Sequence, residues 1–342
     1  RFYGPALYPL DVRILRILDT PLKTIEEYSF LGVNRTLQEL HIINSKLEIF
    51  PKEAFQILGN LSTLVISGHR INNLTSTIFT TSLAAGKLEK LEISNGNLTS
   101  LPTDALTPLR KLKNLNLHKN NINELKRNQF KGLRDTEYLD LSYNSISKLD
   151  PSHLIDLTKL GWCNLSHNSI GELKRGVFAR NTILKVINLS YNKIKKLDSN
   201  TFRGMRFLRR LYLSDNLIND IGRGTFGTLT KIGTIDLARN QLKKIDYQMF
   251  HQLQFAELLD ISENSVTIVE KLAFKDLFLA KINISHNEIM KIEAGAFENC
   301  ANITVLDLSH NKLENISKYA FDSATYATEL QISYNLLTAL NQ

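Results

Sequence analysis

The feature that most constrains this 342-residue chain is a repeat of 24 residues. Five consecutive copies begin at 24-residue intervals from Leu112: "LKNLNLHKNNINEL", "TEYLDLSYNSISKL", "LGWCNLSHNSIGEL", "LKVINLSYNKIKKL" and "LRRLYLSDNLINDI". They share the pattern L-x-x-L-x-L-x-x-N-x-L-x-x-L-x-x-x-x-F. Fourteen copies begin at positions 12, 37, 61, 88, 112, 136, 160, 184, 208, 232, 256, 279, 303 and 327. A period of this length predicts one structural unit per repeat, stacked on its neighbours.

Within each copy, the alternation around positions four and six predicts a short strand with one buried face. Successive strands should lie parallel, about 4.8 Å apart, because each repeat buries its apolar side only against its neighbours. These residues resemble the extracellular, 24-residue class of the leucine-rich repeat family. The resemblance implies an α/β solenoid of horseshoe form, with a parallel concave sheet and a convex side of irregular loops and short helical turns.

Two further positions of the repeat predict how its interior is filled. An Asn at position nine both donates and accepts hydrogen bonds, so it can satisfy backbone groups where the chain turns off the strand. A Phe at position nineteen, replaced by Leu106 and Leu154 in two copies, predicts a stacked aromatic core. The asparagines are Asn120, Asn144, Asn168, Asn192, Asn216, Asn240, Asn264, Asn287, Asn311 and Asn335. The phenylalanines are Phe30, Phe55, Phe79, Phe130, Phe178, Phe202, Phe226, Phe250, Phe274, Phe297 and Phe321.

We expect residues 1–342 to form a single solenoid, irregular over 1–107 and regular over 108–342. The chain begins at Arg1 without a signal-like segment, shows no cysteine-rich cap and ends within a repeat, so we expect it to be a piece of a longer array. The first four copies replace the position-nine Asn by Thr20, Ser45, His69 and Gly96.

The net charge of +8 is concentrated between residues 110 and 210, which carry 21 Lys/Arg and 8 Asp/Glu. A localised basic block indicates either an anionic partner or a solvated surface. Its loop residues could form a strip for acidic polysaccharide. Nucleic acid is not expected, because exposed aromatics do not interleave with the strip. No apolar run is long enough to predict a membrane span. The loop residues are Lys126, Arg127, Lys131, Arg134, Lys174, Arg175, Arg180, Arg203 and Arg206.

Nine N-x-S/T triplets favour a glycosylated protein, extracellular or at the cell surface. Three of them, at Asn164, Asn188 and Asn283, fall within the x-L-S of the repeat, so the repeat itself partly creates them. The full set is Asn34, Asn60, Asn73, Asn97, Asn164, Asn188, Asn283, Asn302 and Asn315.

Several motifs suggest chemistry, but the repeat explains each of them. The "GRGTFG" at 222–227 lies on a return loop, where a dinucleotide site would need a strand before it and a helix after it. Asp236 and Asp260 could form a glycosidase pair, and His286 and His310 a metal or pH site, but stacking creates such pairs automatically. Cys163 and Cys300 lie five repeats apart and are expected to be buried without a disulfide. No enzyme activity, cofactor or metal is therefore expected.

The outward strand positions of repeats six to nine carry an aromatic and basic patch. Tyr, Trp and Arg dominate binding hot spots, so we expect a protein partner here. Glycans on Asn164 or Asn188 would instead cover the patch. Its members are Tyr138, Tyr143, Trp162, His167, Val186, Tyr191, Arg209, Arg210 and Tyr212.

The long array of "LDLSHN"-like units also resembles chaoptin-type adhesion and matrix proteins. This resemblance implies protein recognition without catalysis, in cell adhesion or in an extracellular or apical matrix, with a protein ligand or self-association. The alternative is an ectodomain of a Toll-type innate-immune or growth-factor receptor. A shared fold does not by itself identify the ligand.

Overall fold

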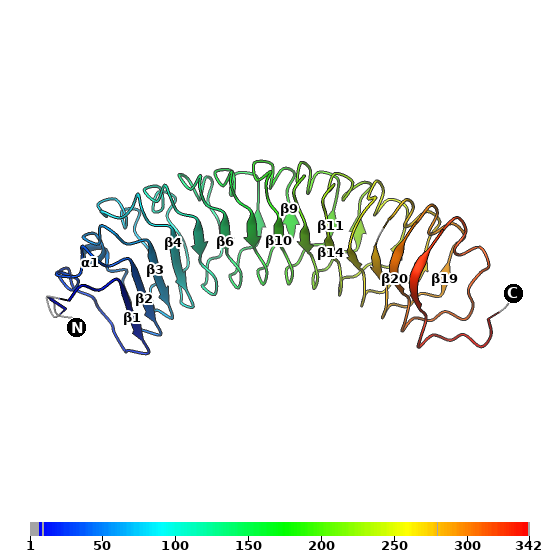
Figure 1. Ribbon diagram of the computed structural model, residues 1–342, viewed down its shortest axis with the longest axis horizontal. Coiled ribbons are helices and arrows are strands. Elements are labelled where there is room, and N and C mark those ends of the chain that lie inside the picture. The colour runs from blue at the N-terminus through cyan, green and yellow to red at the C-terminus, as the bar shows by residue number, and fades with distance from the viewer. Residues whose placement is uncertain (1–6, 9, 279, 341–342) are drawn as a thin grey trace. The chain divides into compact units, whose positions relative to one another are not determined.

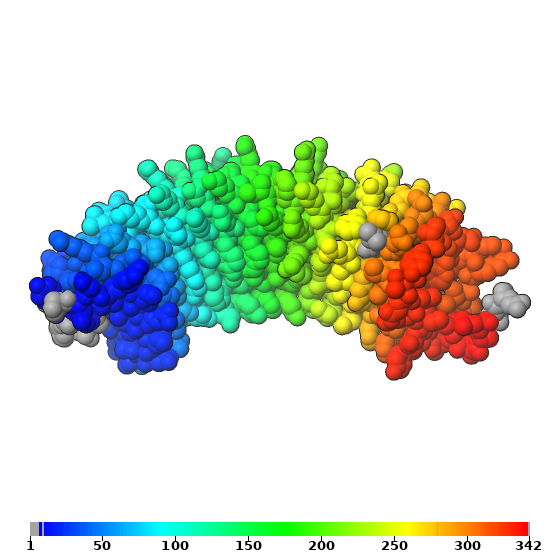
Figure 2. Space-filling model, in the orientation of Figure 1, coloured from blue at the N-terminus to red at the C-terminus, as the bar shows by residue number. Residues whose placement is uncertain are grey.

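The computed structural model describes residues 7–8, 10–278 and 280–340. The chain divides into two compact units, Arg1–Asn168 (unit 1) and Ser169–Gln342 (unit 2). Within each unit the surface colour changes in chain order (Figure 2), because each repeat packs on the repeats before and after it. The organisation as a single array over 1–342 stays a prediction.

Unit 1 is built on a parallel sheet whose strands follow chain order, one per repeat (Figure 1). Leu115 lies opposite Leu139, and Leu139 lies opposite Cys163. These position-four side chains are fully buried, because alternate strand residues point to opposite faces. The strands are β1 (Ile14–Leu18), β2 (Glu39–Ile43), β3 (Thr63–Ser67), β4 (Lys90–Ser94), β5 (Asn114–Asn116), β6 (Tyr138–Asp140) and β8 (Trp162–Asn164).

Unit 2 repeats the same arrangement, again with parallel strands in chain order. Its position-four residues, such as Leu211 and Ile235, are buried and lie opposite one another in the register. The strands are β10 (Val186–Asn188), β12 (Arg210–Tyr212), β14 (Thr234–Asp236), β16 (Leu258–Asp260), β18 (Lys281–Asn283), β20 (Ile303–Asp307) and β21 (Ala327–Gln331). The predicted fold class, a parallel leucine-rich solenoid, is confirmed.

Later in the repeat, the return segments consist mostly of turns. Among the described residues, α1 (Lys52–Phe55) is the only helix, so short helical turns contribute less than expected. Two-residue strands at positions thirteen and fourteen were not predicted, because two residues are too few to show an alternation. They are β7 (Lys148–Leu149), β9 (Glu172–Leu173), β11 (Lys196–Leu197), β13 (Asp220–Ile221), β15 (Lys244–Ile245), β17 (Ile268–Val269) and β19 (Lys291–Ile292).

The position-nineteen phenylalanines form the predicted aromatic core. In unit 2 the rings from Phe178 to Phe321 follow one another with centroids 5.3–6.5 Å apart. In unit 1 Phe130 is fully buried between repeats that carry Leu106 and Leu154, both also buried. Offset stacking of this kind adds to the free energy of burying the rings.

The position-nine asparagines form the predicted hydrogen-bonded ladder, and Asn216 is representative. Its Nδ2 donates to the carbonyls of Leu213 (3.1 Å) and Ser214 (3.2 Å) in its own repeat. It also donates to the Leu189 carbonyl (2.9 Å) of the preceding repeat, and its Oδ1 accepts the Ile194 N–H at 3.1 Å. Each Asn thus satisfies the turn of its own repeat and binds it to the previous one.

In two irregular repeats of unit 1, the position-nine side chain accepts a backbone N–H of its own repeat. The Leu47 N–H donates to Ser45 Oγ (3.2 Å), and the Ile71 N–H donates to His69 Nδ1 (2.9 Å). The regular ladder would satisfy Ile71 from position 96, which is a glycine. A Cβ there would overlap the buried His69 ring. His69 therefore fills the space, and accepts the bond, of the missing asparagine.

Replacing Asn216 by Ala should lower the free energy of unfolding by about 1–3 kcal/mol, because buried backbone groups lose their partners. Chemical denaturation measures the change. The exposed Asn219→Ala in the same repeat is the control and should be near neutral. An unchanged midpoint in Asn216→Ala would show that the ladder adds nothing.

Burial lowers the pKa of His69 from 6.5 to about 4. Between pH 6.5 and 4, His69 is protonated in the unfolded chain but stays neutral in the folded chain. The free energy of unfolding should therefore fall by up to about 3 kcal/mol as the pH drops from 6.5 to 4. Gly96→Asn should destabilise by overlapping the ring, whereas His69→Asn with Gly96→Asn should restore the ladder. The double variant should also lose this pH dependence in thermal unfolding; retention of it would contradict the assignment to His69.

Candidate functional site

Two aromatic rings lie against each other on the outward side of β6 and β8 in unit 1. Tyr138 and Trp162 are direct register partners. Their ring centroids are 4.1 Å apart and their planes differ by 7°. Both side chains are half-buried, so part of each ring is open to solvent. We call them the strand ring pair.

A second pair lies where the chain turns off the same strands. Tyr143 and His167 occupy position eight with φ of 54° and 53°, and this left-handed backbone directs both side chains the same way. Their centroids are 4.0 Å apart at 8°. Lys119 Nζ lies 5.2 Å from the Tyr143 ring centroid, a cation–π distance. We call Tyr143 and His167 the turn ring pair.

The strand end between the two pairs is polar and hydrogen-bonded. Asp140 Oδ1 accepts the Ser142 N–H (2.9 Å) and hydroxyl (2.6 Å). Burial, together with the charges of Asp140 and Glu92, raises the pKa of Tyr138 to about 12. Tyr138 therefore presents a neutral phenol at neutral pH.

The remaining predicted patch residues lie in unit 2. Val186 lies opposite Arg210, and Asn188 lies opposite Tyr212, on β10 and β12. Arg209 and Arg210 are exposed, and Tyr191 is 49% exposed at position eight. The structure thus pairs the four unit 1 residues as rings and places the five unit 2 residues on a separate group of strands and turns. Their role in binding stays a prediction.

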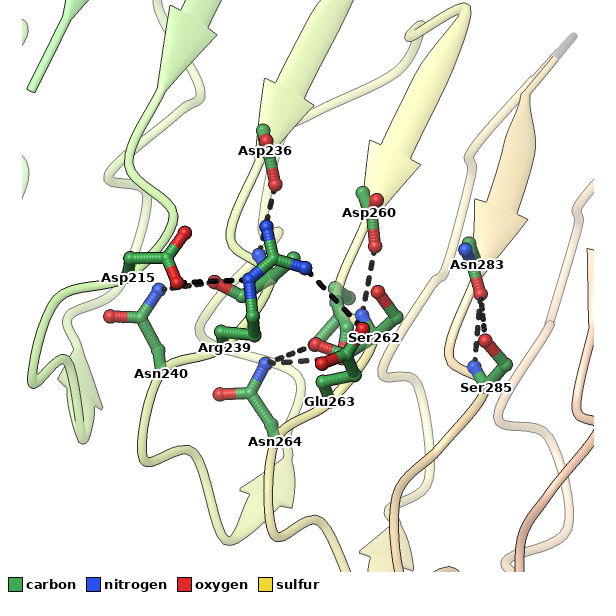
Figure 3. A network of polar contacts seen from close by, with 12 residues as sticks. Asp215, Asp236, Arg239, Asn240, Asp260, Ser262, Glu263, Asn264, Asn283 and Ser285 are labelled. Atoms are coloured by element: carbon green, nitrogen blue, oxygen red, sulfur yellow. Dashed lines mark hydrogen bonds and ion pairs between the residues drawn. The ribbon is translucent and has the colours of Figure 1, made fainter. Parts of the chain in front are cut away.

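Position eight also carries residues that the sequence reasoning missed. Arg239 lies between Asp215 and Glu263 of the neighbouring repeats (Figure 3), with N–O distances of 2.9 and 3.4 Å. Tyr334 extends the predicted His286–His310 pair by stacking on His310 at 4.3 Å. The sequence does contain a signal for these contacts. Residues at position eight of consecutive repeats are neighbours in the fold, so comparing their types along the chain indicates which of them can pair.

The carboxylates of Asp236 and Asp260 act as caps on their strand ends. They are register partners, and each Oδ1 accepts the N–H two residues later, from Ala238 and Ser262. Asn283 makes the same bond to Ser285 (Figure 3). In these repeats Asp and Asn provide the same acceptor oxygen at position five.

The same cap explains the triplets at Asn164, Asn188 and Asn283. Their Oδ1 atoms accept the N–H of the serine of the triplet, at 2.9–3.0 Å. Asp with Ser occupies the equivalent positions at Asp140, Asp260 and Asp307. The other predicted sites are exposed, except the half-buried Asn34; they are Asn60, Asn73, Asn97, Asn302 and Asn315. Occupancy by glycans stays a prediction.

His286 and His310 stack with centroids 4.1 Å apart and planes 11° from parallel. Their in-plane nitrogen lone pairs run side by side, so this geometry does not direct both at one metal ion. Within the described residues, no cluster of three or more His, Cys, Asp or Glu could hold a metal.

Three other sequence features belong to the interior or to loops. Both thiols are free, and burial raises the pKa of Cys163 and of Cys300 to about 12. Phe226 of "GRGTFG" is a buried member of the aromatic core. The nine basic residues predicted for the polysaccharide strip are all exposed. Within the described residues, no helix has the length and apolar character needed to cross a membrane.

Replacing Asp236 by Asn should raise the unfolding midpoint at pH 7. Burial and the Asp260 charge raise the pKa of Asp236 above 3.8, so the ionised carboxylate is disfavoured in the folded chain, whereas Asn keeps the acceptor. The gain should shrink as the pH falls toward 3.8, because the wild-type carboxyl then becomes protonated. The exposed Asp220→Asn is the control; an equal gain there would show that the effect does not depend on burial of the carboxylate.

The comparisons with known proteins agree with this architecture. The family described as "Leucine rich repeat" matches residues 86–134, 110–170, 163–218, 206–266 and 278–337, more than half of the chain. The leucine-rich repeat-containing G-protein coupled receptor 5 of Xenopus tropicalis is 32% identical over 105 residues, which are 30% of this chain and 11% of the receptor.

Two solved structures are similar over nearly the whole chain. A chain of the Toll–Spatzle complex of Drosophila has a TM-score of 0.77 and 24% identity, over 92% of this chain and 41% of that one. The APL1 leucine-rich repeat domain has a TM-score of 0.63 and 21% identity, over 93% and 85%. At these identities the likeness concerns the fold alone. With its repeats, its asparagine ladder and the match over more than half of its length, the chain belongs to the leucine-rich repeat family.

Proposed function

We propose that this chain is a non-enzymatic recognition module, outside the cell or at its surface, that binds a protein partner through the strand and turn ring pairs of unit 1. The observation that carries the proposal is the stacking of both pairs on the outward side of β6 and β8. Rings held in place by stacking lose little freedom on binding, and Tyr and Trp are typical hot-spot residues.

The absence of catalysis is supported by the roles of the groups that could provide it. Asp236 and Asp260 are engaged as strand caps. Cys163 and Cys300 are buried, with their pKa values raised to about 12, so neither supplies a thiolate at neutral pH.

Two biological settings fit such a module. The resemblance to chaoptin-type proteins supports adhesion or matrix organisation, with a protein ligand or self-association. The likeness to the Toll–Spatzle complex and to the Xenopus receptor supports a receptor ectodomain. A membrane-spanning helix followed by a signalling domain in the full-length protein would identify the receptor. The exposed basic loop residues support acidic polysaccharide as an additional partner.

The test is affinity capture with the purified chain, followed by titration of the identified partner. Trp162→Ala should weaken binding at least tenfold, which corresponds to about 1.4 kcal/mol. Tyr28→Ala is the matched control, because Tyr28 is also in unit 1 and is 61% exposed but lies on a return turn. Thermal unfolding of each variant checks that the fold is intact.

Two results would contradict the proposal. One is an equal affinity of wild type and Trp162→Ala for every captured partner. The other is full glycan occupancy at Asn164, which lies two residues from Trp162 on β8, because a glycan there would cover the strand ring pair.

A further inference from the structure

A pocket lies in unit 2 where the strands β12, β14 and β16 begin. It has a volume of about 350 Å³, within the range of small-ligand sites. Position two of successive repeats carries Lys185, Arg209, Gly233 and Glu257, so Gly233 is the place where a side chain is missing. The walls include Arg209, Arg210, Lys231, Phe255 and Glu257.

The atoms around Gly233 leave no room for a side chain at this position. A Cβ at Gly233 would lie 3.2 Å from the Arg209 carbonyl oxygen and 3.3 Å from Glu257 Oε2. Any larger side chain would project between the repeats and occupy the pocket. Because Gly233 is not in the left-handed region, turn geometry does not explain the glycine.

The charges of the pocket are unbalanced. Three cationic side chains face one carboxylate, and within the described residues none of the three forms a salt bridge. Lys231 Nζ lies 5.1 Å from the exposed Phe207 ring centroid, and Phe255 adds an apolar wall. Arginine forks bind carboxylates in a bidentate manner, so the pocket combines an anion site with an apolar surface.

We propose that this pocket receives one carboxylate side chain, next to an apolar residue, from an exposed segment of a protein partner. Glu257 disfavours a polyanion as the ligand. A second negative group of a polyanion would lie near the Glu257 carboxylate and be repelled by it. The site stands on unit 2 alone and does not require the ring pairs of unit 1.

The probe is acetyl-Phe-Glu-amide, titrated by ligand-observed NMR at physiological salt, with acetyl-Phe-Gln-amide as its uncharged analogue. The wild-type chain should bind the acidic peptide at least tenfold more tightly than the analogue. Arg210→Gln should reduce that affinity at least tenfold. Arg206→Gln, an exposed arginine outside the pocket, should change it less than twofold.

Glu257→Gln gives a result that a folding defect cannot imitate, because it should strengthen binding of the acidic peptide about threefold or more. If Arg210→Gln and Arg206→Gln lost the same amount of affinity for the acidic peptide, binding would reflect general charge attraction, and the proposal would be overturned. Preferential binding of a sulfated heparin disaccharide would also overturn it. Trp162→Ala should leave the affinity for the acidic peptide unchanged. The experiment therefore tests the pocket independently of the proposal for the ring pairs.

Discussion

Hydrogen bonds from the position-nine asparagines hold successive repeats of this chain together. Each repeat must turn off its strand while its backbone is buried, and an unpaired buried group costs about 1–3 kcal/mol. One amide side chain satisfies several such groups in two repeats at once, as Asn216 does. The parallel register between successive strands brings residues about 24 positions apart into contact.

His69 and Gly96 show that the buried backbone N–H needs an acceptor in the right place and not an asparagine as such. An imidazole nitrogen accepts the bond that an amide oxygen accepts elsewhere, and the missing side chain at 96 leaves room for the ring. At this step of the array, a bond within one repeat takes the place of the asparagine bond between repeats. Burial keeps the pKa of the His69 imidazole at about 4, well below its usual value of 6.5.

The same register creates the surfaces available for binding. Residues at one position form a column, and the left-handed backbone at position eight keeps that column facing outward. The residue types then decide what the position-eight column offers, which is the turn ring pair in unit 1 and Arg239 between two carboxylates in unit 2. The position-two column contains Gly233, which lines the pocket. The same repeat backbone thus presents an aromatic site in unit 1 and charged sites in unit 2.

The sequence by itself determined the repeat, the parallel strands, the asparagine ladder and the phenylalanine core, because each depends on a period that local residue types display. It also placed Tyr138 and Trp162 on one face. Only the tertiary structure decided that their rings stack, that Arg239 is held by two neighbours, that Asn164 caps its own strand and that a pocket forms beside Gly233. These features depend on how side chains of adjacent repeats are positioned. Those side chains are about 24 residues apart in the sequence, and only the stacking of the repeats brings them into contact.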